Sequence, residues 1–157
     1  MRRRFVWVLI IAFLITGCVM FTSRVSEWTA STNNITIDQI LTAAKGFAAK
    51  TGNEIKIADC RIGNCKKKVA AAVAFIMNKK ENSDNKKVKH QMLVFVDGTK
   101  EKIVVLAIAT VLSNNEEDRR KIQEESTNQF YSYLFQELNI SDRTVVISKP
   151  PALLRDL

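Results

Sequence analysis

The sequence predicts an α+β fold, a small and mostly antiparallel sheet with three helices packed on it, in the order α-β-α-β-β-α-β. Apolar side chains recur at helical spacing in three segments, which are residues 37–48, 69–77 and 122–138. Two β-branched runs follow the second of these segments, and Asp97-Gly98 between them is the strongest short-range signal for a β-hairpin. Helices and strands therefore mix within one domain.

The first helix has clear signals at both ends. Thr36 and Gln39 stand at the spacing of a capping box, and Ile35 can pack on Ile40 as a hydrophobic staple. Gly52 is expected to end the helix. The alternating residues 54–57 that follow, Glu-Ile-Lys-Ile, predict a short strand.

Residues 69–77 are rich in alanine and predict a second helix. Its buried side is expected to hold the apolar residues that recur at helical spacing, namely Val69, Ala72, Val73, Ile76 and Met77. A polar loop is expected over residues 78–87.

The hairpin should follow, with strands at residues 89–96 and 99–112. Its segment 103–112 is apolar on both faces, so we expect a central strand there, covered on two sides. The single histidine, His90, lies at the start of the hairpin and is expected to be an exposed strand residue.

The last helix is expected to open at a second capping box, formed by Ser113 and Glu116. Acidic residues crowd its first turn and basic residues follow, which suits the helix dipole. Asn139 should end this helix. Residues 144–148 predict a final strand, and Pro150-Pro151 should prevent its extension.

The N-terminus carries three arginines at positions 2–4 and then an uncharged apolar run, which is the layout of a signal peptide. The run ends in Ile15-Thr16-Gly17-Cys18. This motif resembles the lipobox of bacterial lipoproteins, in which an aliphatic residue and two small residues precede an obligatory cysteine. The resemblance implies cleavage after Gly17 and acylation of Cys18. The alternative is an uncleaved membrane anchor, because residues 5–23 carry no charge.

The expected organisation is a signal peptide at residues 1–17, an acylated N-terminus and flexible tether at 18–34, and a single α+β periplasmic domain at 35–157. Val19 follows the cysteine where an aspartate would resemble an inner-membrane retention signal. The sequence therefore favours the outer membrane, facing the periplasm. An inner-membrane single-pass anchor is the alternative.

Cys60 and Cys65 flank the turn Arg-Ile-Gly-Asn. In an oxidising compartment two such close cysteines are expected to form a structural disulfide. A redox couple would favour two intervening residues over four, and a zinc site would need two further ligands. No metal or cofactor is expected.

Basic charge is concentrated in residues 61–102, which hold eleven basic and four acidic residues. Such a patch attracts anions. Its candidate members are Arg61, Lys66, Lys67, Lys68, Lys86, Lys87 and Lys89. Nucleic acid is not an expected partner, because the stretch lacks interleaved aromatic residues and a recognisable module.

The chain offers no arrangement of nucleophile, base and orienting group, so we expect no enzymatic activity. The favoured hypothesis is a membrane-anchored envelope lipoprotein that binds a protein partner, as an accessory or assembly factor in secretion, conjugation or envelope biogenesis. The alternatives are a binder of anionic envelope ligands, such as lipid headgroups, lipopolysaccharide or wall polymers, and a periplasmic immunity protein.

Overall fold

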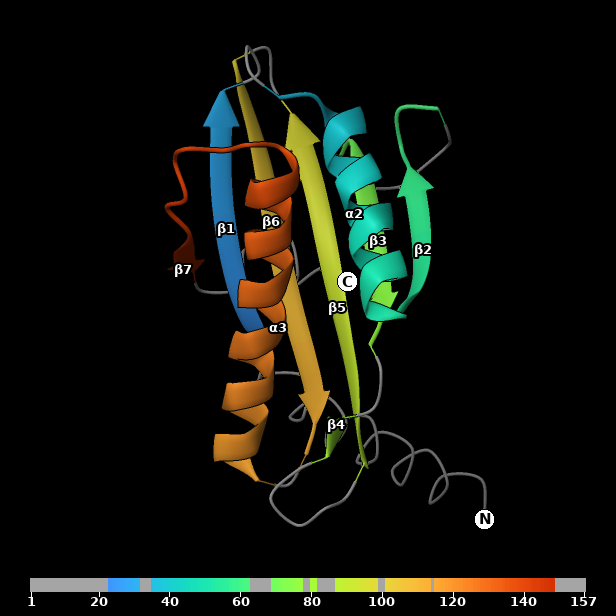
Figure 1. Cartoon of the computed structure of the whole chain (residues 1–157), viewed down its shortest axis with the longest axis vertical. Coiled ribbons are helices and arrows are strands. Elements are labelled where there is room, and N and C mark those ends of the chain that lie inside the picture. The colour runs from blue at the N-terminus through green and yellow to red at the C-terminus, as the bar shows by residue number, and fades with distance from the viewer. Residues whose placement is uncertain are drawn as a thin grey trace, which may run out of the picture.

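The computed structural model describes residues 23–31, 35–62, 69–77, 80–81, 87–98, 101–113 and 115–148. These residues form an α+β domain with one antiparallel sheet and two helices (Figure 1). The strands are β1 (Arg24–Ser31), β2 (Glu54–Asp59), β3 (Ala71–Ile76), β4 (Lys80–Glu81), β5 (Lys87–Gly98), β6 (Lys102–Leu112) and β7 (Val146–Ser148). The helices are α2 (Ile37–Thr51) and α3 (Glu116–Glu137).

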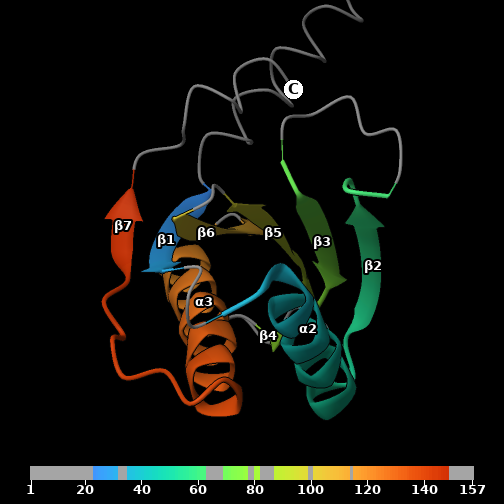
Figure 2. The ribbon, with the colours of Figure 1, turned by 90° about the horizontal axis from the view of Figure 1, so that it is seen from above.

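The strand order is β2-β3-β5-β6-β1-β7, and the short β4 pairs separately with β5. Both helices lie on the same side of the sheet (Figure 2). We call this side the inner face and the other side the outer face. The core lies between the helices and the inner face, where Phe47 of α2 contacts Phe75 of β3 and Phe130 of α3 at ring-centroid distances of 5.5 Å each.

The first predicted helix is confirmed, together with its signals at both ends. The backbone N–H of Gln39 donates to Thr36 Oγ1 at 3.2 Å, and the N–H of Thr36 donates to Gln39 Oε1 at 2.8 Å. Gly52 caps the C-terminus at φ 67°, a left-handed conformation that glycine adopts without strain. The short strand after this helix is also confirmed, as β2.

The second predicted helix is wrong, because residues Ala71–Ile76 form strand β3 between β2 and β5. Ala71, Val73 and Phe75 point to the inner face and are fully buried. Ala72 and Ala74 alternate with them on the outer face. Because the residues on both faces of this strand are apolar, its periodicity does not distinguish it from a buried helix.

The predicted flexible tether at residues 18–34 needs correction as well. Residues Arg24–Ser31 form β1, which pairs with β6 along its whole length and with β7 over its first half. Trp28 is 2% exposed on the inner face, and its indole N–H donates to the carbonyl of Asp142 at 3.1 Å. Serine and threonine dominate the positions around it, which concealed the alternation of a strand.

The β5–β6 hairpin is confirmed, and β6 lies between β5 and β1 as predicted for residues 103–112. Pairing continues to Gly98 and Ile103, so Asp97 and Gly98 belong to the strand and the chain reverses after them. Within the described chain, helices cover only the inner face of β6, and Val104 and Leu106 are half-buried on the outer face. His90 is 4% exposed, which corrects the expectation of an exposed histidine.

The third predicted helix is confirmed as α3, but its cap is Asn115 rather than Ser113. The side chain of Asn115 accepts from the N–H groups of Glu117 and Asp118 at 2.9 and 3.2 Å. The hydroxyl of Tyr131 lies 2.8 Å from the carbonyl oxygen of Ser26 and 3.0 Å from that of Val105, which fixes α3 on the sheet. The final strand is confirmed as β7. None of the helices described here is long and apolar enough to cross a membrane.

Candidate functional site

A network of polar contacts forms at the turn that follows β2, which we call the Arg61 turn and define as residues 59–62. The N–H of Cys60 donates to the carbonyl of Ala70 at 2.9 Å, which holds the start of the turn against β3. The carboxylate of Asp59 then accepts from the backbone N–H of Arg61 at 3.1 Å. An aspartate that binds the backbone two residues ahead fixes a turn of this kind.

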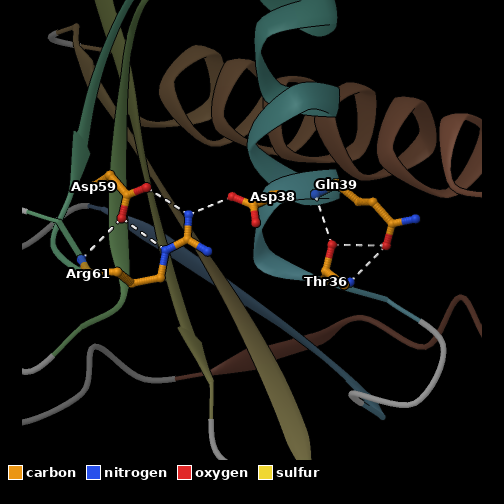
Figure 3. A network of polar contacts seen from close by, with 5 residues as sticks. All are labelled: Thr36, Asp38, Gln39, Asp59 and Arg61. Atoms are coloured by element: carbon orange, nitrogen blue, oxygen red, sulfur yellow. Dashed lines mark hydrogen bonds and ion pairs between the residues drawn. The ribbon is translucent and has the colours of Figure 1, made fainter.

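The side chain of Arg61 folds back over the turn and contacts two carboxylates (Figure 3). Its Nε and Nη2 donate to the two oxygens of Asp59 at 2.9 and 2.7 Å, a bidentate arrangement. The same Nη2 donates to Asp38 Oδ1 at 2.6 Å. Arg61 therefore connects the end of β2 to the first turn of α2.

The position of Asp38 follows from the capping of α2. Thr36 is the N-cap, so Asp38 falls in the first turn, where a negative charge is favoured by the helix dipole. The hydrogen bond from Arg61 lowers the pKa of Asp38 and that of Asp59 below the usual carboxyl range. The hydrogen bonds to Asp59 and Asp38 raise the pKa of Arg61. All three groups stay charged at neutral pH, and together they carry one net negative charge.

This arrangement changes the interpretation of Arg61 as part of an anion-binding patch, because its charge is already compensated by two carboxylates of the same chain. Lys89 is exposed on β5, seven residues from Val96, which pairs with Ala71 beside the Arg61 turn. Seven strand residues span roughly 23 Å, so Arg61 and Lys89 do not form one site. Only the backbone of Lys87 is described, and Lys66, Lys67, Lys68 and Lys86 lie outside the described residues.

Ile62 is the outermost residue of the Arg61 turn and is 88% exposed. Cys60, two residues earlier in the turn, is disulfide-bonded. The expected partner, Cys65, lies outside the described residues, so the predicted pairing stays a prediction. The turn thus presents a large aliphatic side chain to solvent directly after Arg61, whose backbone and side chain both bond to Asp59.

An open hollow of about 240 Å³ lies next to the turn, between the first turn of α2 and the β5–β6 hairpin. Ile35, Ile37 and Ile103 form its apolar walls, and Asp38 and Arg61 form its polar side. An apolar surface beside a fixed ion pair can accept a side chain of another protein, with the ion pair setting its orientation.

Sequence reasoning identified Arg61 and Cys60 but missed Asp38, Asp59 and Ile62. An aspartate two residues before Arg61 was a local signal for the turn. No local signal connects Arg61 with Asp38, which is 23 residues away. Cys18, the predicted acylation site, lies outside the described residues. Among the residues that the structure describes, no cluster of histidine, cysteine and acidic side chains could hold a metal ion.

The sequence of the chain matches no known family model, and no curated protein is significantly similar to it.

Proposed function

We propose that the chain is a non-catalytic envelope lipoprotein, anchored through acylated Cys18, whose domain binds a protein partner as an accessory or assembly factor. The observation that carries the partner-binding part is Ile62, 88% exposed on a turn that is fixed by the contacts of Arg61. Holding the backbone of the turn in place before binding reduces the entropy lost on association. Apolar side chains that become buried on association form the core of protein interfaces.

The anchoring part of the proposal rests on the lipobox at residues 15–18. Two or more acyl chains on one cysteine attach a protein stably, whereas one chain binds reversibly. The proposed location is the outer membrane, with the domain in the periplasm. Intact-mass analysis of the native protein tests this part. A chain that begins at an acylated Cys18 supports the proposal, and a chain that keeps residues 1–17 favours the single-pass anchor and contradicts it.

The partner-binding part is tested by in vivo photo-crosslinking, with a photoreactive amino acid at position 62. Thr42, exposed on α2, is the matched control position. We expect one discrete protein adduct from position 62 and none from position 42. Mass spectrometry should identify an envelope protein in the adduct. The additional substitution Arg61→Ala should reduce the yield of the adduct, because the turn then loses the hydrogen bonds of the guanidinium to Asp59 and Asp38.

Equal labelling at positions 62 and 42, or no adduct at position 62, would contradict this part of the proposal. The alternative of an anion receptor at Arg61 receives less support, since Asp38 and Asp59 already occupy the guanidinium. An anion receptor there would also lose its ligand on Arg61→Gln without any change in protein crosslinking.

A further inference from the structure

The chain enters the described domain on the outer face of the sheet. Ser23 Oγ lies 3.0 Å from Thr110 Oγ1, and β1 begins one residue later at Arg24. Thr110 is on β6 and alternates with the inner-face residues Ala109 and Val111, so its side chain belongs to the outer face. Whatever precedes Ser23 therefore starts beside Thr110.

The distance from this point to the proposed anchor is short. Residues 19–23 connect Cys18 to β1. Five residues span at most about 18 Å even when fully extended. With Cys18 acylated, as the proposed function requires, the lipid headgroups lie within that distance of Thr110. Because residues 24–31 form a strand rather than a tether, the domain then lies directly at the membrane surface.

Three exposed side chains lie beside this entry point, on β3, β5 and β6. They are Ile76, Lys89 and Leu112, and we call them the anchor-side patch. Ile76 and Leu112 are 43% and 49% exposed. Lys89 pairs with Leu112, and Gln91 pairs with both Ile76 and Thr110. The register puts all of them on the outer face, across three adjacent strands that together span about 10 Å.

The charges around the patch allow approach to an anionic surface. Lys89 is exposed at its centre. Glu54, which lies opposite Ile76 on β2, has its carboxylate 3.8 Å from the ammonium group of Lys56. The acidic first turn of α3 is in the helix layer, on the inner side of the sheet. Exposed aliphatic side chains beside a lysine are the composition of surfaces that insert at the headgroup level.

We propose that the anchor-side patch binds the surface of an anionic phospholipid membrane and fixes the orientation of the domain. The inference rests on the proposed acylation of Cys18. Because the anchor keeps the patch at a high effective concentration near the headgroups, weak contacts are sufficient. The Arg61 turn is at the opposite end of the sheet, beside Ala70 and the Val96 end of β5 (Figure 1), so the membrane contact and the proposed partner contact do not overlap.

The test uses the acylated full-length protein in vesicles of phosphatidylethanolamine and phosphatidylglycerol at a three-to-one ratio. A photoreactive amino acid is placed at position 76, 112, 62 or 146, and lipid adducts are quantified by mass spectrometry. Position 146 is a matched control, because Val146 is 58% exposed on β7. We expect lipid adducts at positions 76 and 112 to exceed those at 62 and 146 several-fold.

Charge substitutions sharpen the test. Lys89→Gln should reduce the adduct at position 112 about fivefold in the anionic vesicles and leave it unchanged in phosphatidylcholine vesicles. Lys45→Gln, which removes an exposed lysine of α2, should change neither value. Circular dichroism checks that each variant is folded.

Equal adduct yields at positions 62 and 112, or no effect of Lys89→Gln in anionic vesicles, would overturn the inference. The intact mass of the same sample separates this failure from that of the proposed function. Acylated protein with equal yields contradicts only the fixed orientation, whereas protein without acyl chains on Cys18 contradicts both.

Discussion

The two faces of the sheet differ in what covers them. On the inner face, α2 and α3 bury the aromatic rings of Phe47, Phe75 and Phe130 to 2% exposure or less. On the outer face of the described chain, no helix covers Leu93, Phe95, Val104 and Leu106, which remain half-buried. The helices therefore bury the apolar side chains of the inner face, while on the outer face Val25 and Ile108, which pair with each other, are buried and the apolar residues named above are half-buried.

The largest expected effect on the free energy of unfolding comes from truncating one leucine to alanine on each face. Leu134 of α3 is fully buried against the inner face, and Leu106 is half-buried on the outer face. Leu134→Ala should lower the free energy of unfolding by about 3–4 kcal/mol, because it loses burial and leaves a cavity. Leu106→Ala should cost about 1 kcal/mol. Urea unfolding followed by tryptophan fluorescence measures both, and equal losses would contradict the proposed difference between the faces.

Helix α2 could be predicted from its local signals, whereas strands β1 and β3 could not. Thr36 and Gln39 predicted the start of α2, because a capping box depends on residues three positions apart. Ala71, Val73 and Phe75 were assigned to a helix, because the residues that alternate with them on the outer face, Ala72 and Ala74, are apolar as well. Contacts between distant residues left no local pattern, and the ion pair of Arg61 with Asp38 is the clearest case.

An intermediate effect is expected at Tyr131, whose hydroxyl is buried between the sheet and α3. Tyr131→Phe should cost about 1 kcal/mol at neutral pH, because the carbonyl oxygens of Ser26 and Val105 lose their donor. Burial raises the pKa of Tyr131 above its ordinary value of 10.0. The unfolded chain therefore releases this proton first, and the stability of the folded protein should fall as pH rises above about 10.

The loss of stability at alkaline pH can be compared between the wild-type protein and two variants. Each pH unit above about 10 should cost the wild-type protein about 1.4 kcal/mol more than the Tyr131→Phe variant. Tyr133→Phe removes a hydroxyl from a half-buried residue on the same helix and is the matched control. Urea unfolding between pH 8 and 11 gives the comparison. Parallel pH dependence in the wild-type and Tyr131→Phe proteins would show that this hydroxyl is accessible to ionisation in the folded state.

The smallest expected effect is at the Arg61 turn, where guanidinium–carboxylate hydrogen bonds are formed in contact with water. The hydrogen bonds from Arg61 lower the pKa of Asp38 and Asp59, so both carboxyls favour the folded state above their unfolded pKa. That contribution is lost as the pH falls through their folded pKa values. Because the three groups are accessible to solvent, salt should screen it, and stability at neutral pH should change little on Arg61→Gln.

Carbon-13 NMR titration of the aspartate carboxyls resolves this effect residue by residue. In Arg61→Gln the titration midpoints of Asp38 and Asp59 should both rise toward the ordinary value of 3.8. Asp142 is the internal control, because its pKa is lowered by hydrogen bonds from Thr144 rather than by a cation, and its midpoint should not move. If the midpoint of Asp38 stayed unchanged while that of Asp59 rose, Arg61 would fix only its own turn. The connection from β2 to α2 would then be absent in solution, and Ile62 would lose its support from the helix.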